Sequence, residues 1–361
     1  MKALIAAGGR ATRLRPITWT TNKHLIPLAN KPMLEHAIKK ITDAGILEIA
    51  INVNPGEVEL MSNVFGTGEK WGAQITYIEQ TGGAKGIAHV VANARSFLGE
   101  EPFMFYLGDN IILGSLKQFV EEFQNGGHNC YLAFSKVKDP QRFGVPEFDE
   151  AGILKRVIEK PKEPPSDYAV TGIYLYDKTF FTAYDHIQPS PRGEYEISDI
   201  NTWLLENNHK VGWSEITGWW KDTGTPEAIL EGNASILTDL DHGAFVVEGE
   251  VDPTARLEGM VHVGAGAKIG AGCLLRGPLT IGEGAELENV YVGPYTAIGK
   301  NCVLRHCEIE HSIVFDNASI VDAPRIVDSL IGYNVRIENT ASSKPHSAHR
   351  MIVGDNSYVE L

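Results

Sequence analysis

The chain has 361 residues, 43% of them hydrophobic and 22% charged, and its formal net charge at pH 7 is −14. This length suits two domains, each with a core of its own, and the acidic balance argues against nucleic-acid or anionic-membrane partners. The sequence has no apolar run of 18 residues and its opening apolar run is too short for a signal peptide, so we expect no membrane span and a cytoplasmic protein. The cysteines fit neither a disulfide framework nor paired Cys-x-x-Cys zinc spacing; they are Cys130, Cys273, Cys302 and Cys307.

Apolar strand-like runs alternate with amphipathic helical runs over residues 1 to about 224. This alternation predicts an α/β fold, a doubly wound and mostly parallel sheet that binds ligands at the carboxyl ends of its strands. Thr225 and Pro226 favour the start of a connecting helix over residues 225–238, and we assign residues 1–240 to a first domain. The expected strands are Lys2–Ala7, Glu48–Val53, Gln74–Ile78, Phe103–Leu107, Asn129–Phe134, Ile153–Glu159 and Ala169–Tyr176, and the expected helices include Met33–Ala44 and Ile87–Leu98.

The first strand leads into the most informative motif of the chain. Ala3–Ala7 is apolar, and Gly8 and Gly9 follow it where the backbone can turn sharply and approach a ligand. Exposed amides and nearby basic groups predict a cradle for a polyphosphate, whereas the alternative is an ordinary glycine turn with solvated charges. The string is neither a Walker loop nor a dinucleotide fingerprint. The basic residues that follow are Arg10, Arg13, Arg15 and Lys23.

A carboxylate follows the buried strand Phe103–Leu107. Asp109 stands at the carboxyl end of that strand, where Mg²⁺ would be held. The alternative is a turn aspartate that hydrogen-bonds its own backbone.

Beyond about Asp241 the hydrophobic pattern changes to a period of six. Apolar residues recur at that spacing seven times before the phase slips, which predicts a hexapeptide β-helix of about five coils over residues 241–361, with a C-terminal tail. We expect the clustered Cys302, His306, Cys307 and His311 to point to different faces and to hold no metal. The periodic residues are Val251, Leu257, Val263, Ile269, Leu275, Ile281 and Leu287.

The string Gly-Gly-x-x-Thr-Arg-Leu-x-Pro, followed by Lys-x-Leu-x-Pro-x-x-x-Lys-Pro, resembles the signature of the sugar nucleotidyltransferases. The resemblance covers the whole chain and is greatest to the long form of glucose-1-phosphate thymidylyltransferase, which has a left-handed β-helix after its catalytic domain. It implies Mg²⁺-dependent transfer of a nucleoside monophosphate from dTTP or UTP to a sugar 1-phosphate, with glucose 1-phosphate expected, giving dTDP- or UDP-sugar and pyrophosphate. A phosphate oxygen attacks the α-phosphorus in line, so no protein nucleophile is needed.

The resemblance also implies catalytic residues. It places the metal on Asp109 of Leu-Gly-Asp-Asn and on Asp222 of Trp-Lys-Asp-Thr-Gly-Thr, both hard oxygen donors that suit Mg²⁺. Arg13 and Lys23 are expected on the triphosphate. Lys160 of Glu-Lys-Pro is expected on the sugar phosphate, the alternative being a solvated turn lysine.

Binding residues follow from the same resemblance. The amide of Gln80 matches the O4 and N3–H edge of thymine or uracil, with Gly86 close to the nucleoside. Glu194 would accept hydrogen bonds from sugar hydroxyls, unless it is a solvated loop residue. The nucleotide set is Ala7, Gly8, Gly9, Arg10, Ala11, Thr12, Gln80 and Gly86, and the sugar-phosphate set is Asn110, Gly144, Glu159, Lys160, Val170, Gly172 and Glu194.

Two departures from the family pattern leave the nucleotide open. Ala11 replaces the last glycine of Gly-Gly-x-Gly-Thr-Arg, and its Cβ costs about 1–2 kcal/mol if φ is positive there. Gln80 and Gly86 are six residues apart instead of five and lack the intervening proline, which predicts a looser or reshaped base pocket. The residues therefore do not decide between dTTP and UTP, or between glucose and other sugars.

Two other functions stay open at this point. A bifunctional enzyme would also transfer acyl groups on its β-helix, with His262, His306 or His311 as bases. A non-catalytic regulator would bind sugar nucleotides with a loop that Ala11 has disabled. We further expect a homo-oligomer, because an apolar face of the β-helix would otherwise stay wet.

Overall fold

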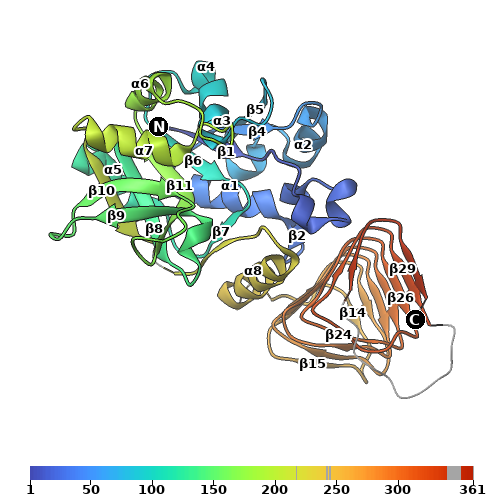
Figure 1. Cartoon of the computed structure of the whole chain (residues 1–361). Coiled ribbons are helices and arrows are strands. Elements are labelled where there is room, and N and C mark those ends of the chain that lie inside the picture. The colour runs from blue at the N-terminus through green and yellow to red at the C-terminus, as the bar shows by residue number, and fades with distance from the viewer. Residues whose placement is uncertain (217, 241–242, 244, 340–350, 361) are drawn as a thin grey trace. The chain divides into compact units, whose positions relative to one another are not determined.

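The computed structural model describes residues 1–216, 218–240, 243, 245–339 and 351–360 (Figure 1). The chain forms two compact units, and each of them is made of two separate stretches of the sequence. The first unit comprises residues 1–9 and 34–222, and the second comprises residues 10–33 and 223–361. Among the described residues, no helix has both the length and the apolar character needed to cross a bilayer.

A seven-stranded sheet in the order β12-β8-β11-β6-β1-β4-β5 forms the core of the first unit. Only β11 runs against its neighbours β6 and β8, while the other pairs are parallel, so the mostly parallel sheet is confirmed. The inner strands are mostly apolar and buried because both faces of the sheet are covered, whereas the edge strands β5 and β12 are more exposed. Their bounds are β1 (Lys2–Ala6), β4 (Glu48–Val53), β5 (Gln74–Glu79), β6 (Phe103–Leu107), β8 (Cys130–Lys136), β11 (Tyr168–Tyr176) and β12 (Val211–Glu215).

Helices connect these strands. The helix expected over Ile87–Leu98 is divided at Ala94, whose ψ of 7° interrupts the helical hydrogen bonding. The helices of this region are α1 (Met33–Asp43), α2 (Val58–Phe65), α3 (Ile87–Asn93), α4 (Arg95–Leu98), α5 (Lys117–Gly126), α6 (Thr179–His186) and α7 (Ile197–Glu206).

Two short antiparallel pairs lie outside the main sheet. The expected strand Ile153–Glu159 is β10 (Leu154–Glu159), which pairs only with β9 (Gly144–Phe148) in a hairpin closed at Asp149. The second pair joins β7 (Asn110–Ile112) to β13 (Trp220–Asp222), two segments far apart in the sequence. Neither pairing was predicted, and both carry candidate site residues.

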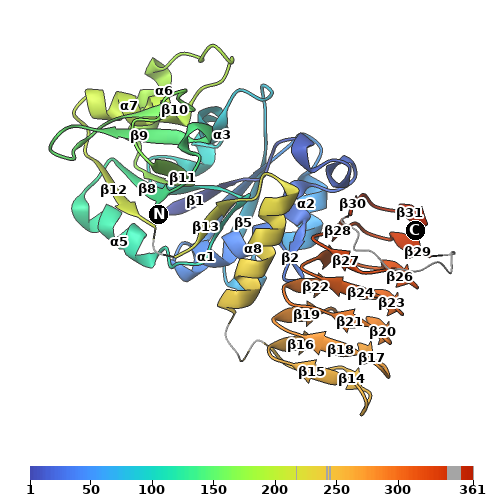
Figure 2. The same ribbon diagram turned by 60° about the horizontal axis from the view of Figure 1, so that its bottom comes forward.

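Three all-parallel sheets form the β-helix of the second unit, consistent with the expected left-handed hexapeptide fold (Figure 2). The three sheets have seven, five and six strands, so the β-helix has about six coils, one more than the expected five. The first sheet contains β14 (Glu250–Val251), β17 (Lys268–Ile269), β20 (Glu286–Glu288), β23 (Val303–Arg305), β26 (Ser319–Val321), β29 (Arg336–Glu338) and β31 (Tyr358–Glu360). The second contains β15 (Arg256–Glu258), β18 (Leu274–Arg276), β21 (Tyr291–Val292), β24 (Glu308–Glu310) and β27 (Ile326–Val327). The third contains β16 (Val261–Val263), β19 (Leu279–Ile281), β22 (Thr296–Ile298), β25 (Ile313–Val314), β28 (Leu330–Ile331) and β30 (Ile352–Val353).

The register of the third sheet explains the phase slips of the hexapeptide pattern. Val263 pairs with Ile281, Ile281 with Ile298, and Ile298 with Val314, so successive coils lose a residue at a corner. These side chains are fully buried and belong to one continuous inner cluster. Several corners are asparagines with positive φ, a conformation that asparagine tolerates better than most residues; these are Asn289, Asn301, Asn317 and Asn334.

Residues 10–33 and helix α8 (Pro226–Asp239) complete the second unit. Thr225 caps α8 by accepting a hydrogen bond from the Ala228 amide, and Pro226 occupies the first turn, as expected for a helix start. The helix packs against β22. Residues 10–33 contain three single 3-10 turns, the two-residue strands β2 (Pro27–Leu28) and β3 (Lys31–Pro32), and the first residue of α1.

Candidate active site

The glycine turn after β1 is held by a side chain from the neighbouring strand. Asn54, directly after β4, accepts a hydrogen bond from the Gly9 amide at 2.8 Å and donates one to the Gly9 carbonyl at 3.2 Å. Gly9 has a φ of 102°, which a side chain would strain, and a Cβ on Gly8 would lie 3.2 Å from the Asn54 oxygen. Ala7 before the turn is fully buried. The turn therefore has a fixed shape at the carboxyl edge of the sheet.

The two candidate metal ligands are brought together by the β7–β13 pair. Asp222 is the register partner of Asn110, the residue that follows Asp109. Because β7 begins directly after the carboxyl end of β6, both carboxylates lie at the edge where parallel sheets bind ligands. The register thus places the backbone of Asp222 opposite the residue after Asp109, and carboxylates are donors that Mg²⁺ uses together with phosphate oxygens and water.

Asn110 fixes the surroundings of Asp109. Its side-chain oxygen accepts hydrogen bonds from the Trp220 indole at 2.8 Å and from the Gly172 amide at 3.3 Å, while its nitrogen donates to Asp109 at 2.8 Å. Two N–H donors on one oxygen settle which way the amide points. Burial raises the pKa of the nearby Tyr106 hydroxyl, and the charge of Asp109 raises it further. The Tyr106 hydroxyl therefore stays protonated and donates to the Asn110 carbonyl.

Lys160 occupies a strained position at the end of β10. Its φ is +45°, and its amide donates to the Phe143 carbonyl at 2.9 Å. Its ammonium lies 3.3 Å from Glu159, which also accepts a hydrogen bond from Ser198 at 2.7 Å. Left-handed backbone at a lysine is uncommon and persists where the surroundings enforce it, often at functional sites.

Arg192 forms the centre of a carboxylate cluster beside Glu159. Its guanidinium lies 2.9 Å from both oxygens of the buried Glu196, 3.5 Å from Glu194 and 3.6 Å from Glu159. Burial raises the pKa of Asp199 nearby, and the charges of Glu196 and Glu159 raise it further. One arginine thus offsets several carboxylates at the predicted sugar pocket.

The remaining sugar-set residues pack closely. A Cβ on Gly144 would lie 2.9 Å from the Ser198 hydroxyl, and one on Gly172 would lie 2.6 Å from the Asn110 side chain. Val170 is buried within β11. At both glycines the backbone lies so close to a polar side chain that any residue with a Cβ would clash with that side chain.

The Gln80–Gly86 loop contacts the loop that carries Glu194. Gln80 follows β5, and its amide nitrogen lies 3.0 Å from Nδ1 of His89 while its oxygen is buried without a partner. Burial lowers the pKa of His89, and Lys85 lowers it further. Gly86 has a φ of 91°, and a Cβ there would lie 2.5 Å from the Tyr195 carbonyl. The structure thus brings the predicted base-binding and sugar-binding loops together.

Residues 10–33 carry the basic part of the motif. Ala11 adopts the left-handed conformation with φ 42° and ψ 47°, and its carbonyl accepts hydrogen bonds from the Thr18 hydroxyl and the Leu14 amide. Thr12 and Arg13 form the 3-10 turn that follows, with Arg10 directly before Ala11. Lys23 begins a later 3-10 turn and is only 8% exposed.

We expect Ala11→Gly to change the protein little, although the position has positive φ. The left-handed alanine costs about 1–2 kcal/mol, but glycine gains back about 0.4–1 kcal/mol of freedom in the unfolded chain. The free energy of unfolding in urea should rise by about 1.6 kcal/mol at most, and the KM for the nucleoside triphosphate should change by less than threefold. A tenfold gain in kcat/KM would instead mean that the methyl group crowds the triphosphate.

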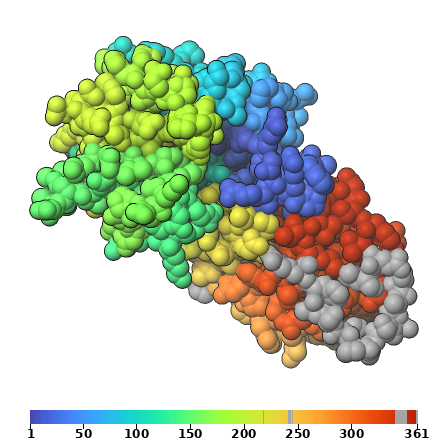
Figure 3. Space-filling model, viewed as in Figure 1, coloured from blue at the N-terminus to red at the C-terminus, as the bar shows by residue number. Residues whose placement is uncertain are grey.

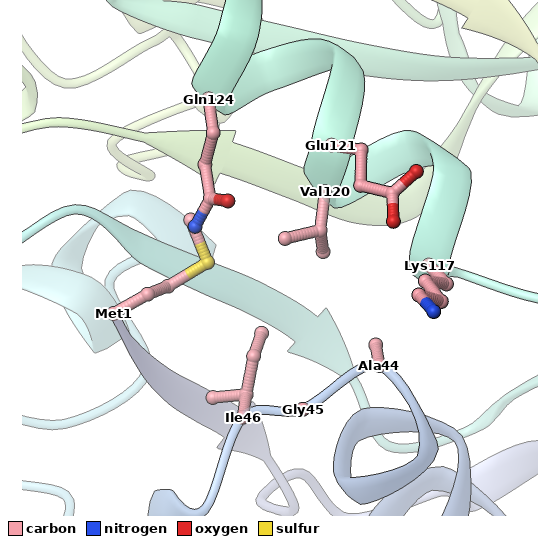
Figure 4. A pocket seen from close by; sticks show the side chains of 8 residues that line it. All are labelled: Met1, Ala44, Gly45, Ile46, Lys117, Val120, Glu121 and Gln124. Atoms are coloured by element: carbon pink, nitrogen blue, oxygen red, sulfur yellow. The ribbon is translucent and has the colours of Figure 1, made fainter.

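Other places in the structure give less support for a functional site. Among the described residues, no three histidine, cysteine, aspartate or glutamate side chains form a group that could hold a metal ion. A separate hollow lies between Ile46, after α1, and Val120 of α5, and none of the predicted site residues lines it (Figure 4).

Sequence reasoning missed three residues of the site. Asn54 shapes the glycine turn, Trp220 donates to Asn110, and Arg192 offsets the carboxylates. Asn54 and Arg192 stand next to segments that the motif analysis singled out, since one follows the strand Glu48–Val53 and the other precedes Gly193.

Comparisons with known proteins show the family of this chain. The family model described as nucleotidyl transferase matches residues 2–239. The chain is 40% identical over its full length to the low-salt glycan biosynthesis nucleotidyltransferase Agl11 of Haloferax volcanii, also covered completely. It is likewise 40% identical to a glucose-1-phosphate thymidylyltransferase of Streptomyces griseus, with 100% of this chain and 99% of that one covered.

A solved structure covers the first two thirds of the chain. It is a candidate glucose-1-phosphate thymidylyltransferase from Bacillus anthracis in complex with sucrose, 39% identical, with a TM-score of 0.62. The match covers 67% of this chain and 96% of that one. From the family match and the full-length relatives together, the chain belongs to the nucleotidyl transferase family.

Proposed function

We propose that the chain transfers a nucleoside monophosphate from dTTP or UTP to glucose 1-phosphate, releasing pyrophosphate. The observation that supports the proposal is the pairing of β7 with β13, because it places Asp222 opposite Asn110, the residue that follows Asp109. Full-length relatives named as glucose-1-phosphate thymidylyltransferases support the choice of substrates.

The donor set at this edge fits a magnesium ion. Asp109 and Asp222 would hold it through carboxylate oxygens, and a bound Mg²⁺ would offset charge on the reacting phosphates. The Asn110 amide keeps Asp109 oriented by donating to it at 2.8 Å. Trp220 and Gly172 hold Asn110 in turn, because both donate hydrogen bonds to its side-chain oxygen. The carboxylate of Asp109 is therefore positioned before the substrate binds.

Cationic side chains supply the rest of the charge balance. We assign Arg13 and Lys23 to the triphosphate and Lys160 to the phosphate of the sugar. Lys160 has a positive φ, a backbone conformation that favours glycine. A lysine at such a position supports a role on the sugar phosphate, because strained backbone is often found at functional sites. Transfer of a nucleotidyl group depends mainly on positioning and charge stabilisation, so these groups and the metal suffice without a protein nucleophile.

The nucleotide and sugar pockets follow the same assignment. The buried oxygen of Gln80 is an acceptor suited to the N3–H of thymine or uracil. Gly86, packed against Tyr195, would approach the nucleoside, and Glu194 would accept from sugar hydroxyls. The choice between dTTP and UTP rests on this loop.

A panel of nucleoside triphosphates against sugar 1-phosphates tests the proposal by pyrophosphate release. We expect dTTP or UTP with glucose 1-phosphate to give the highest kcat/KM, and omission of Mg²⁺ to abolish release. A protein without activity on any pair would contradict the proposal and favour a binding regulator. Consumption of acetyl-CoA with a sugar-phosphate acceptor would revive acyl transfer on the β-helix.

The wider expectations stay proposals. We propose a boundary near residue 240 between the catalytic and β-helix domains. We also propose a cytoplasmic location, with which free and buried cysteines agree.

A homo-oligomer has less support than expected, because α8 packs on the third sheet of the β-helix and Ala297, Ile313 and Leu330 are already buried there. Light scattering would establish the oligomeric state.

A further inference from the structure

We propose that the last coil of the β-helix positions the triphosphate-binding segment, with Asp355 as the positioning residue. The inference rests on the proposed function only in assigning the triphosphate to Arg13 and Lys23. Its structural basis is a set of hydrogen bonds within the second unit. In Figure 3 the blue N-terminal segment borders the red C-terminal coils.

The segment that needs positioning has little regular structure of its own. Residues 10–33 contain only single 3-10 turns, the two-residue strands β2 and β3, and Met33 at the start of α1. Such short turns are weakly stable without tertiary contacts. The whole segment nevertheless belongs to the same compact unit as the β-helix and α8. The packing partner must therefore fix its conformation.

Asp355 contacts the segment two residues before Lys23 in the sequence. One oxygen of its carboxylate accepts hydrogen bonds from the Thr20 hydroxyl at 2.7 Å and from the Thr21 hydroxyl at 2.8 Å. The other oxygen accepts from the Tyr333 amide of the preceding coil at 2.9 Å, which anchors the carboxylate to the β-helix. Hydrogen bonds to a charged acceptor are stronger than neutral ones, and the half-buried Thr21 contact is shielded from water.

A second anchor holds the other end of the segment. The Asn30 amide donates to the Ile298 carbonyl at 2.7 Å, on the third sheet of the β-helix. The Ala29 amide donates to Asn233 of α8, and Asn233 donates in turn to the Tyr295 carbonyl, both at 2.8 Å. Lys23 lies in the sequence between the two anchors.

The preceding coils contain a matched residue without the threonine contacts. Asp316 occupies the corner equivalent to Asp355, since Val314, Ile331 and Val353 pair in register two residues before each corner position. Its carboxylate accepts from the Lys300 amide at 2.8 Å, as that of Asp355 accepts from Tyr333. The corner hydrogen bond is therefore common to both residues, and the bonds to residues 20 and 21 distinguish Asp355.

Comparison of Asp355→Ala with Asp316→Ala separates positioning from β-helix stability. Both variants lose one corner hydrogen bond, and Asp355→Ala also loses the two threonine bonds, so we expect its thermal unfolding midpoint to fall at least as far as that of Asp316→Ala. Only Asp355→Ala should raise the KM for the nucleoside triphosphate, about tenfold, because it releases the segment that carries Lys23. The KM for the sugar 1-phosphate should stay within twofold of the wild-type value.

Further variants show whether the hydrogen bonds themselves matter. Asp355→Asn should retain a near wild-type KM, because the threonine hydroxyls can accept from its amide as well as donate. The double variant Thr20→Val/Thr21→Val should reproduce the effect of Asp355→Ala, and combining the two should add little more.

The outcomes distinguish this inference from the proposed function. A wild-type protein that releases no pyrophosphate would contradict the proposed function. An active wild-type protein whose Asp355→Ala variant keeps its nucleotide KM within twofold would overturn the positioning role. An equal rise in KM for Asp316→Ala would also overturn it, since general weakening of the β-helix would then explain both.

Discussion

Asp109→Asn is expected to lower kcat for pyrophosphate release by about 10³-fold, the scale seen when a charge-stabilising group is removed from an active site. Asparagine has the same shape and can still accept the hydrogen bond that Asn110 donates to Asp109. The fold around it should therefore persist, while the site loses one negative ligand for Mg²⁺. Steady-state kinetics over a range of Mg²⁺ concentrations measures the effect.

Two companion variants make this result interpretable. Asp222→Asn should lower kcat on a similar scale, because Asp222 pairs in register next to Asp109. Asp149→Asn removes a carboxylate that closes the β9–β10 hairpin by accepting from the Ile153 amide, and kcat should remain near the wild-type value. If both Asp109→Asn and Asp222→Asn kept near wild-type rates at saturating Mg²⁺, the metal assignment would be wrong.

Gly172→Ala is expected to cost about 1–3 kcal/mol in the free energy of unfolding, the range for overpacking a filled site. The new methyl group would lie 2.6 to 2.8 Å from three atoms of the Asn110 side chain, far inside van der Waals contact. Asn110 would have to move, and its hydrogen bonds to Trp220 and Asp109 would break or lengthen. We therefore expect kcat to fall by about 10²-fold as Asp109 loses its fixed orientation.

A double variant tests the cause. Asn110→Ala removes the atoms that the methyl group meets, so Gly172→Ala should cost much less stability in that background than in the wild type. Urea unfolding of the four proteins gives the coupling free energy. Equal costs of Gly172→Ala in both backgrounds would show that the crowding at Asn110 is not responsible.

Long-range pairing was the part of the fold that sequence patterns could not show. Apolar runs such as Phe103–Leu107 were recognised because a strand buried on both faces leaves a continuous signal. The strands β7 and β13 have three residues each, too few to establish a period, and more than a hundred residues separate them. Their pairing depends on a contact that neither segment specifies alone.

The candidate site was predictable where chemistry and position coincide. Asp109 follows a buried strand, where a carboxylate can hold a metal or stabilise its own turn, and the family motif favoured the metal. Asn54 and Arg192 were missed because their roles depend on partners, a glycine amide for one and three carboxylates for the other. The sequence could not show whether Ala11 has a left-handed backbone, because that conformation depends on its surroundings. In the structure its φ is 42°.

The threonine–aspartate contact also has a consequence for synthesis of the chain. Thr20 and Asp355 are separated by 335 positions, so this hydrogen bond cannot form until the C-terminal coil has left the ribosome. At roughly 5–20 residues per second, residues 20 and 21 of a nascent chain lack this contact for tens of seconds. Contacts of such large sequence separation also form late in folding because they close a long loop. Residues 20 and 21 are therefore among the last parts of this unit to reach their final conformation, and nucleotide binding would report that the coil containing Asp355 has folded.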